Sequence, residues 1–212
     1  MGDPARKIKP PVKPATLEDL LAIPAEERRH EIIDGELVPK EASSPRHGLG
    51  QVSMSGQLWS VFGGPPGRRG PGGWWILSEV EVLFAPDQLY RPDISGWRRE
   101  RLPRLPDTWP MTLRPDWVCE ILSPSNTTND TVKKRRTYHR YQVPHYWILD
   151  PMRGELTVYR WADGGYLVVA EATRGERIRA EPFDAVELDV DELLGYGEEA
   201  EEETPPAGEP EP

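Results

Sequence analysis

Cysteine is nearly absent from the chain, with Cys119 as its single copy. One cysteine can form neither an intrachain disulfide nor a zinc site of cysteine ligands. Because disulfides are rare in reducing compartments, we expect a cytoplasmic location. No run of residues approaches the ~20 apolar residues that a membrane-spanning helix needs, so we expect no membrane partner. Residues 1–14 lack the apolar core of a secretory signal, which agrees with this location.

Acidic residues outnumber basic ones, but the excess is concentrated at one end. The net charge is −10, and residues 198–212 contribute seven glutamates and no lysine or arginine. By contrast, the segment from Arg91 to Arg140 holds eleven basic and six acidic residues, a local balance of +5. A basic segment favours a polyanionic partner, although a solvated surface is the alternative. We expect a flexible arm over 1–15, one domain over 16–195, and a disordered acidic tail over 196–212.

Local signals in the N-terminal third predict a helix, a hairpin and a second helix. Thr16 is a suitable N-cap for a short helix, which Pro24 ends. Residues 31–38 predict a hairpin around an Asp-Gly turn, and apolar residues at helical spacing predict a helix over 48–62. The glycine-rich segment 63–73 lacks the Gly-Lys-Ser/Thr ending of a phosphate-binding loop, so a nucleotide site there is disfavoured.

The central region predicts a mixed sheet. Alternation indicates a long strand over 74–84 and a return strand over 89–97, while the apolar segment 116–122 is typical of a strand buried on both faces. A helix over 130–141 is long enough to cross over to a parallel strand at 143–150. Further elements are expected in the C-terminal part: a hairpin over 155–161 and 166–170, a last strand over 183–188, and a helical turn over 191–194. The fold class is therefore α/β, with a mixed sheet flanked by helices.

Two acids interrupt the apolar strands of this sheet. By strand alternation, Asp93 shares a face with Ser95, and Glu120 shares a face with Val118. If the strands are neighbours, the two carboxylates lie side by side and repel each other unless a cation intervenes. Mg²⁺ or Mn²⁺ would relieve this repulsion, with the Ile121 carbonyl as a third protein ligand.

A lysine beside such a metal would steer the attacking water and stabilise developing negative charge. Lys134 is the candidate, because the helix after Glu120 can lean back over the strand ends. Each residue has a structural alternative. Asp93 alone would suit a strand end, Glu120 a buried ion pair, and Lys134 a solvated helix face. Their combination favours a metal-dependent phosphodiesterase.

Four segments carry a specific resemblance. Residues 91–94 (Arg-Pro-Asp-Ile), 116–126, 130–138 and 143–151 resemble the Uma family of putative restriction endonucleases, within the PD-(D/E)XK nuclease superfamily. The resemblance covers roughly residues 16–190. It implies an α-β-β-β-α-β core, Mg²⁺-dependent cleavage of phosphodiester bonds, and a homodimer. It assigns the motif aspartate to Asp93 and the second acid to Glu120.

The chain departs from the short motif at Leu122, where a lysine is expected two residues after the acid. In this family the lysine comes from the following helix, which matches Lys134. Glu31 also resembles a family motif and is a candidate for orienting water or metal, with a surface hairpin acid as the alternative. Glu79 is a candidate auxiliary acid, and a solvated strand face is its alternative. His47 either faces the cleft or lies in a loop before the helix.

The leading hypothesis is a Mg²⁺-dependent DNA endonuclease. Its phosphate contacts are predicted at six basic residues: Arg98, Arg99, Arg101, Lys133, Arg135 and Arg136. The first alternative is a non-catalytic module that binds nucleic acid or protein. The second is an enzyme acting on RNA or on another phosphoester, because a metal site does not identify the leaving group.

Overall fold

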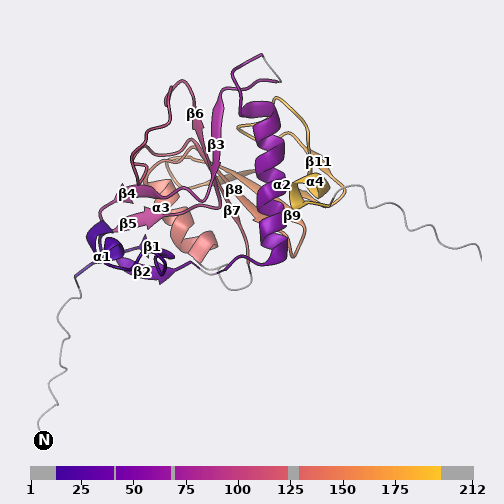
Figure 1. The fold of residues 1–212 in the computed structure, drawn as a ribbon. Coiled ribbons are helices and arrows are strands. Elements are labelled where there is room, and N and C mark those ends of the chain that lie inside the picture. The colour runs from indigo at the N-terminus through magenta and orange to yellow at the C-terminus, as the bar shows by residue number, and fades with distance from the viewer. Residues whose placement is uncertain (1–12, 41, 68–69, 124–128, 197–212) are drawn as a thin grey trace, which may run out of the picture.

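A six-stranded mixed sheet forms the centre of the computed structural model, which describes residues 13–40, 42–67, 70–123 and 129–196 (Figure 1). Its strand order is β10 (Leu167–Thr173), β9 (Glu155–Arg160), β8 (His145–Asp150), β7 (Trp117–Ile121), β6 (Ile94–Arg98) and β3 (Trp74–Ser78). Only β7 and β8 are parallel to each other within this sheet, and the crossover between them contains the π-helical segment η1 (Asn129–Lys134) and α3 (Arg135–Arg140). The predicted order of elements in the core, α-β-β-β-α-β, is confirmed.

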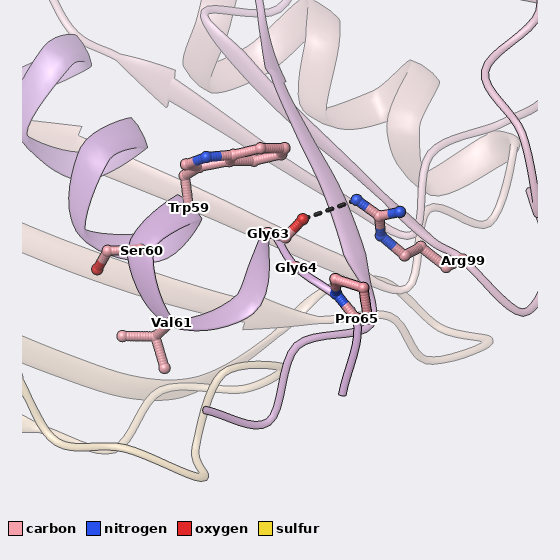
Figure 2. A pocket seen from close by; sticks show the side chains of 7 residues that line it. All are labelled: Trp59, Ser60, Val61, Gly63, Gly64, Pro65 and Arg99. Carbon is pink, nitrogen blue, oxygen red and sulfur yellow. Dashed lines mark hydrogen bonds between the residues drawn. The ribbon is translucent and has the colours of Figure 1, made fainter. Parts of the chain in front are cut away.

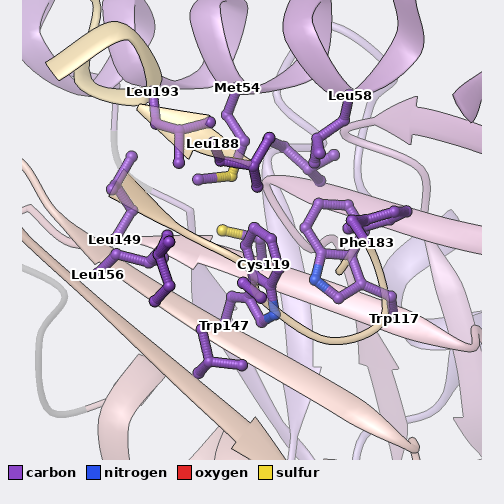
Figure 3. Packing of buried hydrophobic residues seen from close by; sticks show 14 of the residues in the cluster. Met54, Leu58, Trp117, Cys119, Trp147, Leu149, Leu156, Phe183, Leu188 and Leu193 are labelled. Atoms are coloured by element: carbon purple, nitrogen blue, oxygen red, sulfur yellow. The ribbon is translucent and has the colours of Figure 1, made fainter. Parts of the chain in front are cut away.

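Helices cover both faces of this sheet. One face carries α2 (Pro45–Phe62) and α4 (Val190–Leu194), and Figure 3 shows Met54 and Leu58 of α2 packing over Cys119 and Trp117 of β7. The opposite face carries α3, whose Tyr138 packs with Val118, Tyr146 and Ile148. Every residue of β7 is buried. Burial on both faces of the sheet therefore explains its near-continuous apolar sequence, as predicted.

A second, four-stranded sheet stands beside the first. Its order is β2 (Glu36–Pro39), β1 (His30–Ile33), β5 (Gln88–Tyr90) and β4 (Val82–Ala85), and α1 (Leu17–Leu21) packs on it through Leu20. The predicted hairpin is confirmed, with Asp34 (φ 51°) and Gly35 (φ 75°) in its turn. The α1 helix begins after Thr16, whose backbone N–H donates to the Asp19 carboxylate at 2.8 Å.

The predicted long hairpin of residues 74–84 and 89–97 is wrong in one respect, because both of its strands are broken. The first strand divides into β3 and β4 around Glu79, which has a positive φ of 58°. The second divides into β5 and β6 at Arg91-Pro92-Asp93, where Pro92 has no N–H to donate to a ladder. The two halves of the hairpin therefore belong to different sheets, and the sequence alternation does not reveal this.

The C-terminal part departs from expectation at one element. Residues 183–187 form no strand. Only β12 (Leu188–Asp189) pairs there, with β11 (Arg177–Ile178), because Phe183 instead packs its ring into the core against Trp74 and Trp117. The helical turn is present as α4, capped by the Asp189 side chain. In the part of the chain that the structure describes, no helix combines the length and apolar character needed to cross a membrane. The expected arm lies largely and the acidic tail almost wholly outside the described residues.

Candidate active site

The two predicted acids meet where the broken strands leave the large sheet. β6 and β7 are antiparallel, with Ile94 opposite Cys119 and Ser95 opposite Val118. Continuing this register by one residue places Asp93 opposite Glu120, and opposite residues of an antiparallel pair have Cα atoms about 5 Å apart. The Glu120 side chain leaves the sheet on the face that α3 covers, where Tyr138 donates to it, whereas the Asp93 carboxylate at the end of the sheet reaches His47 of α2.

Asp93 is buried, 3% exposed, and its carboxylate is held from three directions. Oδ2 accepts a hydrogen bond from the backbone N–H of Ile121 at 2.7 Å and lies 3.1 Å from His47 Nε2, while Oδ1 lies 3.0 Å from Lys40 Nζ. Burial alone would raise the pKa of Asp93. The hydrogen bond from His47 and the positive charge of Lys40 outweigh it and hold the pKa well below its usual range. Asp93 is therefore ionised at neutral pH.

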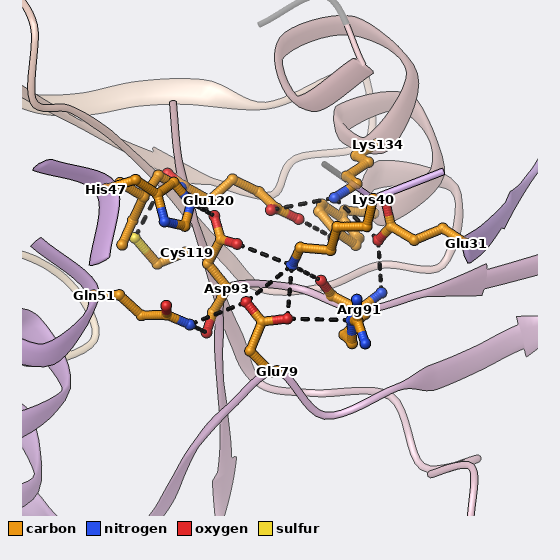
Figure 4. A network of polar contacts seen from close by, with 12 residues as sticks. Glu31, Lys40, His47, Gln51, Glu79, Arg91, Asp93, Cys119, Glu120 and Lys134 are labelled. Carbon is orange, nitrogen blue, oxygen red and sulfur yellow. Dashed lines mark hydrogen bonds and ion pairs between the residues drawn. The ribbon is translucent and has the colours of Figure 1, made fainter. Parts of the chain in front are cut away.

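Glu120 is buried beside Lys134, the last residue of η1 (Figure 4). Lys134 Nζ lies 3.3 Å from Glu120 Oε2 and 3.1 Å from Glu31 Oε1, and its side chain is fully buried. The Tyr138 hydroxyl, one turn further along α3, donates to Glu120 Oε1. Glu31 Oε1 also accepts from the backbone N–H of Arg91 at 2.7 Å. The structure thus brings Asp93, Glu120, Lys134 and Glu31 into one buried cluster, while their catalytic and metal-binding roles stay predictions.

Lys40 is a member of this cluster that the sequence analysis missed. It follows β2 directly, and its ammonium contacts the Asp93 and Glu79 carboxylates and the Arg91 carbonyl. Burial would lower the pKa of Lys40, but the charge of Asp93 and those of Glu120 and Glu79 raise it above its ordinary value. No local sequence signal marks Lys40, because its partners lie 39 to 53 positions away.

α2 contributes two further side chains. His47, in its first turn, lies buried against Asp93, and Gln51 donates to the Asp93 carbonyl at 2.8 Å. His47 is therefore a buried residue of α2 beside Asp93 and does not lie in a loop before the helix. Gln51 was also missed, although its spacing of four residues from His47 puts both on one helix face. That spacing was the signal available in the sequence.

Glu79 lies at the edge of the cluster. Its side chain is 35% exposed, and it pairs with Lys40 at 3.0 Å and with Arg91 Nε at 3.1 Å. The left-handed backbone at Glu79 turns the chain from one sheet into the other and directs this carboxylate toward the site. It is therefore not a freely solvated strand residue.

Three of the predicted phosphate contacts lie elsewhere. Arg98 ends β6, five residues or about 17 Å along the strand direction from Asp93. Arg99 donates to the Gly63 carbonyl at 2.7 Å at the edge of a hollow of about 300 Å³ (Figure 2), and Arg101 pairs with Asp116. These arginines are not part of the cluster. Their predicted contacts with phosphate stay a prediction, which their positions away from the cluster do not support.

The other three basic residues lie nearer. Lys133 precedes Lys134, and Arg135 and Arg136 begin α3, where they line a hollow together with His139 and Tyr166. They are partly or fully exposed, so their predicted phosphate contacts are sterically open.

The candidate ligands for a cation are the two buried carboxylates of Asp93 and Glu120. Within the described ranges, no group of three His, Cys, Asp or Glu side chains could hold a metal ion. Mg²⁺ is usually held by one or two carboxylates together with waters and substrate phosphates, so the pair Asp93 and Glu120 is sufficient in kind. The backbone N–H of Ile121 contacts Asp93, whereas the predicted ligand role of its carbonyl remains a prediction.

Tyr138→Phe should lower the free energy of unfolding by about 2 kcal/mol, because a buried carboxylate loses a charge-assisted hydrogen bond. Tyr166→Phe is the matched control: that hydroxyl donates to the neutral Val143 carbonyl, and its loss should cost only about 1 kcal/mol. Urea denaturation of both variants measures the difference. Equal losses would show that Glu120 does not depend on Tyr138.

Comparison with known proteins relates the chain to a family of putative nucleases. A family model described as "Uma2: Putative restriction endonuclease" matches residues 17–191. Among solved structures, the chain is similar to a putative nuclease belonging to DUF820 from Anabaena variabilis ATCC 29413, with 24% identity and a TM-score of 0.66 over 86% of this chain and 99% of that chain. At this identity the likeness shows a shared fold. The search of curated proteins found no match.

Proposed function

The chain belongs to the Uma2 family of putative restriction endonucleases, and on this premise we propose that it is a Mg²⁺- or Mn²⁺-dependent endonuclease that hydrolyses phosphodiester bonds of DNA. The observation that carries the proposal is the cluster in which the Asp93 carboxylate is bonded to the Ile121 amide, next to Glu120 in β7, with Lys134 Nζ 3.3 Å from Glu120. The homodimer and the cytoplasmic location that we expect from the sequence belong to the same proposal.

In this proposal Asp93 and Glu120 would hold the cation, which would supply Lewis-acid activation of the phosphodiester and of the attacking water. The protein supplies orientation. The Ile121 amide and His47 fix the Asp93 carboxylate, and Lys134 and Tyr138 fix that of Glu120. The ammonium of Lys134 adds positive charge where negative charge develops in the transition state. Glu31 positions Lys134 from its other side.

Glu120→Gln should reduce Mg²⁺-dependent cleavage at least ~100-fold, because a neutral amide is a poor ligand for a hard cation. Glu155→Gln on β9 is a matched control on the same sheet, half-exposed and outside the cluster, and should cleave like the wild type. The assay follows nicking of supercoiled DNA with Mg²⁺, with Mn²⁺ and with EDTA. Undiminished cleavage by Glu120→Gln, or cleavage in EDTA, would contradict the proposal.

A second candidate is a non-catalytic binding module on the same fold. It is favoured by one observation: both central acids already have lysine partners, Lys40 for Asp93 and Lys134 for Glu120. Buried ion pairs of this kind also occur in clusters that have only a structural role. Calorimetric titration with Mg²⁺ and Mn²⁺ separates the two candidates, since the module binds neither ion at the acids.

A further inference from the structure

The Lys40 ammonium occupies a position surrounded by the oxygen atoms that a hard cation prefers. It lies 3.0 Å from Asp93 Oδ1, 3.0 Å from Glu79 Oε2 and 2.7 Å from the Arg91 carbonyl oxygen (Figure 4). These three partners use all three of its N–H donors. Only 7% of the side chain is exposed. A carboxylate oxygen of the proposed metal site, Asp93 Oδ1, is therefore already paired with the positive charge of Lys40.

We propose that Lys40 is a built-in counter-ion that holds Asp93 in the metal-free protein and releases it when a divalent cation binds. This inference rests on the proposed function, because it takes Asp93 to be a metal ligand. Without a counter-charge, the ionised and buried Asp93 would be costly to the fold. With Lys40 in place, a cation that binds Asp93 must either displace the Lys40 ammonium or remain close to its positive charge. Either case weakens metal binding.

The surroundings of Lys40 give the ammonium a place to move. A hollow of about 370 Å³ lies beside it, lined by Arg29, Lys40, Ala42, Ser43, Gln51, Glu79 and Arg91. Glu79 borders this hollow and is one-third exposed, whereas Asp93 is buried. Lys40 can therefore give up Asp93 and keep its pair with Glu79 at the edge of the hollow. Lys134, by contrast, is fully buried between Glu31 and Glu120.

Lys40→Met tests the competition. Methionine keeps the length and apolar stem of lysine but removes its charge, so Mg²⁺ should bind about tenfold more tightly in calorimetry without nucleic acid. Mg²⁺ should also raise the melting temperature of Lys40→Met more than that of the wild type. Lys13→Met, an exposed lysine before α1, is the matched control and should bind Mg²⁺ as the wild type does. Binding by Lys40→Met that is equal to or weaker than wild type overturns the inference and leaves the nuclease proposal intact. If neither protein binds Mg²⁺ or Mn²⁺, the metal-dependent function falls as well.

Amine labelling tests the displacement in the wild-type protein, so it does not depend on the folding of a variant. Acetic anhydride should modify Lys40 slowly in EDTA and several-fold faster at saturating Mg²⁺, with K⁺ at matched ionic strength as the reference condition. Mass spectrometry reports each lysine, and the exposed Lys13 serves as the internal control with an unchanged rate. If Mg²⁺ binds while the labelling of Lys40 stays unchanged, the ammonium does not leave Asp93 and the inference is wrong.

Discussion

Lys134→Met should lower the free energy of unfolding by about 3–5 kcal/mol and reduce cleavage at least ~100-fold. The stability loss is large because Lys134 is fully buried between Glu31 and Glu120, and its removal leaves both carboxylates without that charge. Cleavage falls because the same ammonium stabilises negative charge at the proposed metal site. Urea denaturation in EDTA measures stability, and DNA nicking below the melting temperature of both proteins measures activity.

The neighbouring lysine is the control for stability. Lys133 is only partly buried, so Lys133→Met should change the free energy of unfolding by less than about 0.5 kcal/mol. Adding Glu31→Gln to Lys134→Met removes one of the two uncompensated acids and should recover part of the stability without recovering cleavage. If Lys134→Met lowers the free energy of unfolding by less than about 1 kcal/mol, the contacts of Lys134 with Glu31 and Glu120 behave like solvated surface ion pairs. The buried arrangement would then be wrong.

Asp93→Asn should abolish Mg²⁺-dependent cleavage and lower the free energy of unfolding by about 3 kcal/mol at pH 7. Cleavage is lost because the amide no longer offers a charged ligand to the cation. Stability falls because Lys40 loses its charge partner and His47 and the Ile121 amide lose a carboxylate acceptor. Nicking assays and urea denaturation of the two proteins measure both effects.

The difference in free energy of unfolding between wild type and Asp93→Asn should shrink only at acidic pH. The pKa of Asp93 is lowered in the folded protein, so its ionised form stabilises the fold at every pH above the unfolded value of about 3.9. As the pH falls below about 4, protons bind the unfolded chain first, and the contribution of Asp93 is progressively lost. The gap between wild type and Asp93→Asn should therefore not narrow from pH 8 to pH 5, and should narrow only below about pH 4. A gap that narrows between pH 7 and pH 5 would contradict the lowered pKa.

The order of elements was predictable because its signals are local. Apolar spacing marks α2, the Asp-Gly pair marks the first hairpin, and the apolar segment at β7 marks a buried strand. Asp93 and Glu120 were singled out because an acid inside an apolar segment is conspicuous in the sequence, whereas Lys134 was chosen from the helix that follows Glu120 and from the family resemblance. The parallel pairing of β7 with β8 followed from the length of the connection alone.

The break in the long hairpin was not predictable from alternation. Residues 74–84 alternate throughout, yet Glu79 adopts a left-handed conformation, held by ion pairs with Lys40 and Arg91. The departure from regular strand structure occurs at the candidate site. There the ion pairs of Glu79 outweigh the local preference of its segment for extended backbone.

By itself, the sequence determined the order of the core elements and which acids stand where apolar residues belong, because periodicity and the cost of burying charge act on near neighbours. Only the tertiary structure decided which charges meet. Lys40 reaches Asp93 across 53 positions and His47 reaches it across 46, and the energy of such pairs depends on distance and burial in space, about which residue order carries no information.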